Sequence, residues 1–507
     1  MPAKTLMIQG TASHVGKSTV VAALCRYFKN KGLRVAPFKA QNMSNNSFAL
    51  ASGGEIGRAQ AAQAKACGIE PSVHMNPVLL KPSTDQKSQV VILGKVEGNL
   101  DATDYHSYKK KLFPIVLDSL HHLMNQYDLV LIEGAGSAAE INLKEGDIVN
   151  MAIAKSIASP VLLTGDIDKG GIFAQLIGTY ELLDKEEKDL VKGFLINKFR
   201  GDKKILEPGL RIIEERTSKK VLGVLPYLTG GLPEEEDSVA LEELGTVPKG
   251  TVPNSSELLI HVVRFPRISN FTDFEPLASE QGVRVVYKER PNRWEVPDLL
   301  ILPGTKSTFS DLEFLKNSGF VEEIKRYMKI GVPILGICGG YQMLGEKLLD
   351  PHQVESDLRE RDGLGLIPST TVFEKNKRVA QVKGVHLESS LSFEGYEIHM
   401  GCTQGRTGSK PLFKISERYG MPIEDFDGIS FEDNNGSSST IWGTYIHGLF
   451  NSNSFRKYFI NSLRIKSGLE PISNENRARS VPDPMDFLAN MMKENIDMSY
   501  LEKIVGI

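Results

Sequence analysis

LMIQGTASHVGKSTVVAALCRYF, residues 6–28, decides the fold of the first part of the chain. A short apolar strand runs into a glycine-containing turn, and an apolar helix follows the pair Lys17–Ser18. Glycines let backbone N–H groups approach a polyphosphate, the lysine neutralises its terminal charge, the hydroxyl suits Mg²⁺, and the helix begins at the anion. The stretch therefore predicts a phosphate-binding loop between a strand and a helix.

The spacing within this loop departs from the usual pattern. Five residues separate Gly10 from Gly16, one more than usual, but the Lys–Ser pair and the flanking elements make an ordinary glycine turn the weaker interpretation. The predicted nucleotide contacts in the loop are Gly10, Thr11, His14, Val15, Gly16, Lys17, Ser18 and Thr19.

Short apolar runs alternate with amphipathic stretches along most of the chain. Strands are expected at 34–39, 128–134, 159–168 and 191–198, and the alternation restarts between 257 and 338. Strand and helix in turn predict largely parallel sheets. The expected fold class is α/β, with two domains that are each a mostly parallel sheet flanked by helices.

The domain boundary is expected where this alternation stops. Residues 229–256 are rich in Gly, Pro, Ser and acidic residues and have no sustained apolar face, so we interpret them as a linker. The first domain then spans 1–228. The second spans 257–507 and ends in a helical extension.

Composition excludes several classes of protein. The chain has 507 residues and a net charge of −3, so no basic field is available to hold nucleic acid. Its four cysteines form no CxxC pair, and no segment reaches the roughly 18 apolar residues of a membrane helix. We expect a cytoplasmic protein that binds neither nucleic acid nor membrane, and the oligomeric state stays open.

Polar residues end several predicted strands of the first domain. Glu133 follows one strand and could hold Mg²⁺, directly or through water, together with Ser18. Asp166 and Asp168 follow another and could serve a metal or a substrate, although helix capping explains one of them equally well. The predicted metal ligands are Ser18, Glu133 and Asp166.

Cys338 lies in the sharpest strand–turn–helix junction of the second domain. In VPILGICGGYQMLG, residues 332–345, small neighbours allow a tight turn that lifts the thiol above the sheet. The N–H of the next residue, Gly339, points to the oxyanion formed when a thiolate attacks an amide. The pattern predicts a catalytic nucleophile.

A histidine is needed as the base for this thiol. His447 follows a β-rich run in STIWGTYIHGLF, residues 439–450, and is favoured by its place at a strand end. His399 is the one rival, because the other histidines lie in the phosphate loop, within a strand or on helical surfaces.

Residues from about 257 to 455 resemble the class I, or triad-type, glutamine amidotransferase domain. The resemblance implies that Gly304, in LILPGTKST, donates the second oxyanion N–H. In the family the third member of the triad is a carboxylate two residues beyond the histidine, and here that position is Leu449. Either a dyad suffices or an acid from elsewhere serves.

The longer phosphate loop resembles that of dethiobiotin synthetase, whose relatives bind adenine where Asn197 ends a strand. Combined with the amidotransferase resemblance, the chain is similar over nearly its whole length to the corrinoid amidases, and specifically to the cobyric acid synthase family. The distinctive segments are FKAQNMSNNS (38–47), GEIGRAQAAQA (54–64), NPVLLKP (76–82), NLKEGDIVNM (142–151), GDIDKGGIFA (165–174), INKFRGD (196–202), GICGGYQMLG (336–345) and TYIHGLF (444–450).

This resemblance implies amidation of the b, d, e and g carboxylates of adenosylcobyrinic acid a,c-diamide, with ATP, Mg²⁺ and glutamine as the ammonia donor. ATP would convert each carboxylate to an acyl phosphate that ammonia attacks. The implied contacts to the corrinoid substrate are Gln41, Asn42, Asn45, Asn46 and Asp147.

Two alternatives stay open at this point. The first is a related a,c-diamide synthase or a cell-wall amidase built from similar parts, against which the segment AQNMSNNS, residues 40–47, argues. The second is a P-loop ATPase switch carrying a non-catalytic amidotransferase module. Such switches resemble one another in a lysine early in the loop, and none lies between Gly10 and Gly16.

Overall fold

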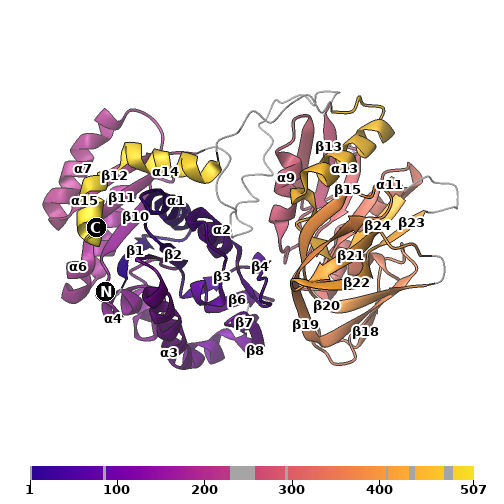
Figure 1. Ribbon diagram of the computed structural model, residues 1–507, viewed down its shortest axis with the longest axis horizontal. Helices are drawn as coiled ribbons and strands as arrows, with labels where there is room; N and C mark the ends of the chain where they lie inside the picture. The colour runs from indigo at the N-terminus through magenta and orange to yellow at the C-terminus, as the bar shows by residue number, and fades with distance from the viewer. Residues whose placement is uncertain are drawn as a thin grey trace.

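The computed structural model describes residues 3–83, 87–228, 257–291, 295–406, 409–432, 440–472 and 483–507. These residues form two α/β domains (Figure 1). The predicted linker, 229–256, lies outside the described residues. The predicted fold class, two domains with mostly parallel central sheets and flanking helices, is confirmed.

A six-stranded parallel sheet forms the centre of the first domain, in the order β12-β11-β10-β1-β9-β2. Its strands are β1 (Lys4–Gly10), β2 (Val35–Phe38), β9 (Leu129–Glu133), β10 (Val161–Asp166), β11 (Val191–Phe199) and β12 (Lys220–Pro226). The phosphate loop therefore leaves a central strand, with β9 on one side and β10 on the other.

Alternate residues of β1 supply the cores on the two faces of this sheet. Met7 packs on one face, beneath α3 (Ala102–Gln126), α4 (Met151–Ser156), α5 (Ile172–Leu182) and α7 (Lys203–Thr217). Leu6 and Ile8 pack on the other, beneath α1 (Lys17–Asn30). This period of two is what a strand buried on both faces requires.

The last two helices of the chain lie on the first domain, on the same face as α1, as Figure 1 also shows. The sequence-based prediction assigned this helical extension to the second domain. In the structure α14 (Pro484–Asn495) and α15 (Met498–Val505) bury Leu488, Met492 and Leu501 there. Tyr27 donates to Glu502 at 2.7 Å, which ties α15 to α1. Position in the chain did not predict the domain on which these helices pack, because an amphipathic helix can cover any sheet face whose apolar side chains are exposed.

Smaller elements of the first domain lie toward the second domain. One four-stranded sheet contains β3 (Gln41–Met43), β6 (Val78–Pro82), β7 (Lys87–Ile92) and β8 (Lys95–Asp101), and a hairpin pairs β4 (Ser47–Ala49) with β5 (Glu55–Gly57). Helix α2 (Arg58–Cys67) follows the hairpin directly. The remaining short helices are η1 (Val73–Met75), η2 (Ile141–Gly146) and α6 (Lys185–Leu190).

The second domain has its own central sheet, in the order β14-β13-β15-β16-β24-β23, in which only the edge strand β23 is antiparallel. Its strands are β13 (Leu258–Val263), β14 (Val283–Lys288), β15 (Leu299–Leu302), β16 (Ile334–Ile337), β23 (Ile429–Glu432) and β24 (Thr440–Thr444). Its helices are η3 (Phe271–Phe274), α9 (Glu275–Ala278), α10 (Thr308–Ser318), α11 (Phe320–Lys329), α12 (Gly339–Leu344), η4 (Leu449–Asn451) and α13 (Asn453–Lys466).

A second, largely antiparallel sheet of this domain was not anticipated from the sequence. It comprises β17 (Lys347–Leu349), β18 (Glu360–Asp362), β19 (Ser369–His386), β20 (Ser392–Gly405), β21 (Phe413–Arg418), β22 (Met421–Asp427) and β25 (Ile446–His447). Its long strands reach the first domain, where Ala49 of β4 packs with Val379, Tyr396 and Ile398. The two domains are thus in contact through buried side chains.

Candidate active site

Cys338 occupies the turn between β16 and α12 in a strained backbone conformation. Its φ of 51° and ψ of −109° are unusual for a residue with a side chain, and its N–H donates to the carbonyl of Thr444 at 2.8 Å. Sγ lies 3.4 Å from the carbonyl oxygen of Ile398. The predicted sharp turn is present, and Cys338 is held at the carboxyl end of a central strand.

His447 ends β25, which follows β24 closely in the chain and belongs to the antiparallel sheet, and its side chain is fully enclosed. Its Nδ1 lies 2.6 Å from Oδ2 of Asp273, and the other oxygen of Asp273 accepts the N–H of Gly448 at 3.0 Å. Burial alone would lower the pKa of His447, but the Asp273 carboxylate, with a contribution from Cys338, raises it to about 10. The geometry gives the imidazole a fixed orientation beside the thiol.

Asp273 is the carboxylate next to His447, where the family's usual position for this acid is occupied by Leu449. It lies in η3, 174 residues before His447, and is 3% exposed. Leu449 itself is buried in the apolar core of the domain, where a carboxylate would have no partner. Of the two possibilities left by the sequence, the structure provides the acid from elsewhere.

The rival histidine, His399, has a different environment. Its Nδ1 is 2.7 Å from the carbonyl oxygen of Gly401, and its ring stacks on Tyr445 at 3.9 Å between centroids. Glu397 lies at the outer limit of an ion pair, 4.0 Å away. His399 therefore lacks the close carboxylate that orients His447.

The two glycines predicted to bind an oxyanion lie next to these residues. A Cβ added at Gly304 would come within 3.1 Å of the His447 ring, and one added at Gly339 within 2.5 Å of the Thr305 side chain. Within the part of the chain that the structure describes, no group accepts the N–H of Gly304 or Gly339. Gly339 directly follows Cys338, and Gly304 lies after β15 beside His447, so both N–H groups are close to the predicted nucleophile and base.

A cavity of about 50 Å³ borders Cys338, and both domains line it. Lys81 and Gln89 come from the first domain, and Lys377 and Gln342 from the second. Lys81 pairs with the buried Glu55 at 2.8 Å, and Lys377 forms an ion pair with the same carboxylate across the domain contact. Burial lowers the pKa of Lys377 to about 7, despite the opposing effect of Glu55.

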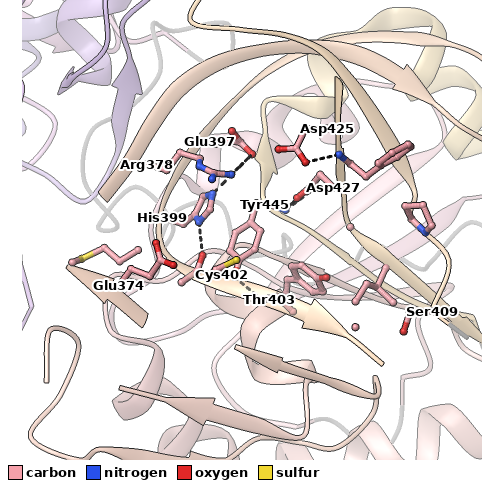
Figure 2. Close-up of a pocket in the computed structure, with 18 of the residues that line it drawn as sticks. Glu374, Arg378, Glu397, His399, Cys402, Thr403, Ser409, Asp425, Asp427 and Tyr445 are labelled. Carbon is pink, nitrogen blue, oxygen red and sulfur yellow. Dashed lines mark hydrogen bonds and ion pairs between the residues drawn. The ribbon is translucent and has the colours of Figure 1, made fainter. Parts of the chain in front are cut away.

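A larger cavity, of about 640 Å³, lies in the antiparallel sheet beside the first (Figure 2). The two share Lys377, His399 and Met400. Figure 2 shows His399 on the wall of the larger cavity, near Glu397 and Tyr445, and the same histidine also lines the smaller cavity at Cys338.

The phosphate loop has the predicted strand–loop–helix geometry. Gly16 has a φ of 91°, and a Cβ there would come within 2.1 Å of the Asn197 amide, so only glycine fits. Nζ of Lys17 donates to the carbonyls of Ala12 and Gly136, at 2.8 and 3.0 Å, which places its charge over the loop. The exposed His14 has a positive φ of 59°.

Other loop residues have more local contacts. Thr11 donates to Gln175 at 3.3 Å, Val15 is buried beneath the loop, and Thr19 lies in the first turn of α1. Asn197, predicted to contact adenine, donates from Nδ2 to the carbonyl of Val15 at 2.9 Å. Its amide therefore supports the loop, and its contact with adenine stays a prediction.

Glu133 is the centre of the polar contacts at this end of the sheet. Its Oε1 accepts from the Ser18 hydroxyl at 2.8 Å and pairs with Lys39 at 2.9 Å, and its Oε2 accepts from Gln63 at 2.6 Å. Burial would raise the pKa of Glu133, but Lys39 and these hydrogen bonds lower it, so it is ionised. Sequence reasoning found Glu133 and Ser18 but missed Lys39 and Gln63.

The aspartates at the end of β10, Asp166 and Asp168, already form ion pairs, which compete with binding of a metal or substrate. Asp166 pairs with Lys198 at 3.0 Å and accepts the N–H of Asp168 at 2.9 Å. Asp168 pairs with Arg200 at 3.0 Å. These contacts give both aspartates a role in stabilising the loop after β10. A metal-binding role for Asp166 stays a prediction.

The residues predicted to contact the corrinoid do not all cluster. Tyr105 donates to Gln41 at 2.5 Å, Asn42 donates to Gln60 at 3.2 Å, and Asn46 is buried nearby. Oδ1 of Asn45 is a buried acceptor with no partner among the residues described.

Asp147 stands apart from that segment. Its carboxylate accepts three backbone N–H groups, from Val149, Asn150 and Ala152, each within 2.9 Å. It therefore fixes the turn into α4, and a substrate contact by Asp147 stays a prediction.

The fold and the site together define a glutamine-dependent ligase, in which a nucleotide-binding domain is joined to an amidotransferase domain. Residues 6–238 match the CobQ/CobB/MinD/ParA nucleotide binding domain, and residues 259–455 match the CobB/CobQ-like glutamine amidotransferase domain.

Relatives that match the chain over its full length identify the family within this class of ligases. The chain is 48% identical over its whole length to the cobyric acid synthase of Thermodesulfovibrio yellowstonii, all of which it covers. It is 47% identical to that of Dehalococcoides mccartyi and 46% identical to that of Clostridium botulinum, in each case over 99% or more of both chains. The chain belongs to the cobyric acid synthase family. Within the described residues, the helices include none that has the length and apolarity to span a bilayer.

Proposed function

We propose that the protein uses ATP and glutamine to convert peripheral carboxylates of a corrinoid into amides. Following the resemblance set out above, the substrate is adenosylcobyrinic acid a,c-diamide, the b, d, e and g carboxylates react, and the product is adenosylcobyric acid. The observation that carries the proposal is the small cavity at Cys338, because residues of the nucleotide-binding domain form part of its wall. Ammonia released there would leave beside the domain that consumes it.

In the glutaminase half, the thiolate of Cys338 attacks the side-chain amide of glutamine. His447 gives a proton to the departing ammonia, and the thioester that remains is hydrolysed by water that His447 deprotonates. The N–H groups of Gly304 and Gly339 stabilise the negative oxygen of each tetrahedral intermediate. Asp273 holds the imidazole in the tautomer that this sequence needs, through the 2.6 Å contact to Nδ1.

In the synthetase half, the phosphate loop holds ATP while a corrinoid carboxylate attacks its terminal phosphorus. This attack displaces ADP and forms an acyl phosphate. Ammonia then attacks the acyl carbon, and phosphate and a proton leave, which gives the amide. Lys17 lies over the loop, where its charge suits the terminal phosphates.

The donor set beside the loop fits Mg²⁺. The Ser18 hydroxyl and the Glu133 carboxylate are oxygen ligands 2.8 Å apart at the start of α1, which suits a hard cation that keeps water and phosphate oxygens as its other ligands. Bound there, Mg²⁺ would neutralise charge on the phosphates. We propose Asp166 as a further ligand of this metal. We also propose that the protein acts in the cytoplasm.

The test separates the two halves. Cys338→Ala should abolish amidation with glutamine and leave amidation with ammonium unchanged, because ammonium bypasses the glutaminase. Loss of both activities would contradict the division of labour. Mass spectrometry of the corrinoid product should show four amidations, whereas two would favour an a,c-diamide synthase. ATP turnover that no corrinoid stimulates would contradict the substrate.

A further inference from the structure

Arg58, the first residue of α2, reaches from the nucleotide-binding domain into the amidotransferase domain. Its Nη1 donates to the hydroxyl of Tyr396 at 2.6 Å, and its guanidinium lies 5.6 Å from the centre of the Tyr396 ring. Both side chains are only 4% exposed. A buried arginine is costly unless it is well bonded, so this contact is a specific part of the domain interface.

Tyr396 in turn contacts two members of the proposed triad. It pairs with His447 across β20 and β25, and their rings stack with centroids 5.2 Å apart and planes at 17°. The Tyr396 hydroxyl donates to Oδ1 of Asp273 at 3.4 Å. Because it accepts a hydrogen bond from a cation, this hydroxyl is polarised toward Asp273 and becomes a better donor.

A second contact from the same part of the first domain reaches the segment that carries Asp273. The N–H of Ser47 donates to Oδ1 of Asn270 at 3.0 Å. Asn270 has a positive φ of 50° and immediately precedes η3, the helix in which Asp273 lies. Two contacts made by the hairpin β4–β5 and by α2 thus converge on the acid that orients His447.

We propose that Arg58 is a positioning residue for the glutaminase, acting through Tyr396 on Asp273 and His447, so that glutamine hydrolysis is fast only while the two domains are docked. The proposal rests on the proposed roles of Cys338 and His447. It assigns to the nucleotide-binding domain a part in assembling the other domain's active site. Arg58 does not line the cavity at Cys338, so its effect falls on turnover and not on glutamine binding.

The test uses the full-length protein and measures glutamine hydrolysis and ammonium-dependent amidation separately. Arg58→Met should lower kcat for glutamine hydrolysis roughly 10- to 100-fold, the range expected from losing a hydrogen bond to a charged group. The KM for glutamine and the ammonium-dependent rate should each stay within about twofold.

Tyr396→Phe keeps the ring on His447 and removes the hydroxyl, so it should lower kcat similarly. The double variant should be no worse than either single variant, because both remove one chain of contacts. Additive losses would overturn the proposal.

The matched control is Gln381→Ala, which removes another hydrogen bond between the domains, from Nε2 to the carbonyl of Ala49 at 3.1 Å. It should leave kcat unchanged.

Three outcomes would overturn the proposal. They are an equal loss of kcat in Gln381→Ala, an equal loss of ammonium-dependent amidation in Arg58→Met, and an unchanged kcat in Arg58→Met. Thermal unfolding of each variant identifies any that fails to fold, and Arg58→Lys then replaces Arg58→Met with the same expected direction. Failure here leaves the outcome for Cys338→Ala unaffected, so the two proposals fail separately.

Discussion

Nδ1 of His447 lies 2.6 Å from Oδ2 of Asp273, although 174 residues separate them in the chain. The carboxylate is 3% exposed and the imidazole 1% exposed, so water does not compete for this contact. Asp273 thus occupies the orienting position that the sequence leaves empty at Leu449. Several consequences can be measured.

Asp273→Asn should lower the rate of glutamine hydrolysis by roughly 10²- to 10⁴-fold, as expected when a triad acid becomes an amide. The asparagine would donate to Nδ1 and leave Nε2 protonated, so the imidazole could not accept the proton of Cys338. Steady-state assays with glutamine and with ammonium should show loss of the first activity alone.

The control for this change is Glu280→Gln, which alters another carboxylate of the same segment. Glu280 pairs with Arg456 at 2.7 Å and contacts no residue of the proposed triad, so glutamine hydrolysis should be unaffected. Near-normal hydrolysis by Asp273→Asn would show that a dyad suffices.

The pKa of His447 should be about 10 in the unaltered protein and fall in Asp273→Asn. Burial, which lowers the pKa, would then be opposed by Cys338 and no longer by a carboxylate. Imidazole NMR signals followed against pH, and assigned with His447→Gln, measure this directly. Titration of His447 near pH 7 in the unaltered protein would contradict the ion pair.

Stability should follow the same titration. Because the folded pKa is raised, this histidine stabilises the protein fully below about pH 6.5, and the contribution is lost as pH rises toward about 10. The free energy of unfolding should therefore fall over that window in the unaltered protein. In Asp273→Asn this part of the decline should be absent.

Local patterns predicted Cys338, His447 and the phosphate loop, because each depends on a strand end followed by a turn of small residues. Asp273 could not be found this way, since its segment, RISNFTDFEP at 267–276, has no periodicity and its partner is distant. Arg58 lies in the segment GEIGRAQAAQA, 54–64, whose local pattern does not indicate that this side chain reaches another domain. The C-terminal helices were recognised as helices, but their amphipathic pattern does not specify which sheet face they cover.

Ser18→Ala should reduce amidation with glutamine and with ammonium by the same factor, roughly 10- to 100-fold, since a hydroxyl that serves a charged ligand contributes about 1.5–3 kcal/mol. The Ser18 hydroxyl donates to Glu133 at 2.8 Å and is proposed to bind Mg²⁺. The Mg²⁺ concentration for half-maximal rate should rise. A loss confined to glutamine would contradict this role. Ser310→Ala, on the surface of α10, is the control.

Leu501→Ala should destabilise the first domain by about 2–5 kcal/mol, because the leucine is fully buried among residues of the nucleotide-binding domain. ATP raises the unfolding transition of the domain that binds it, which identifies that transition in a thermal scan. Leu501→Ala should lower this transition and leave the other in place. Phe487→Ala, at a position 54% exposed in α14, should change neither. If the other transition moved instead, the C-terminal helices would belong energetically to the amidotransferase domain, as their order in the chain suggests.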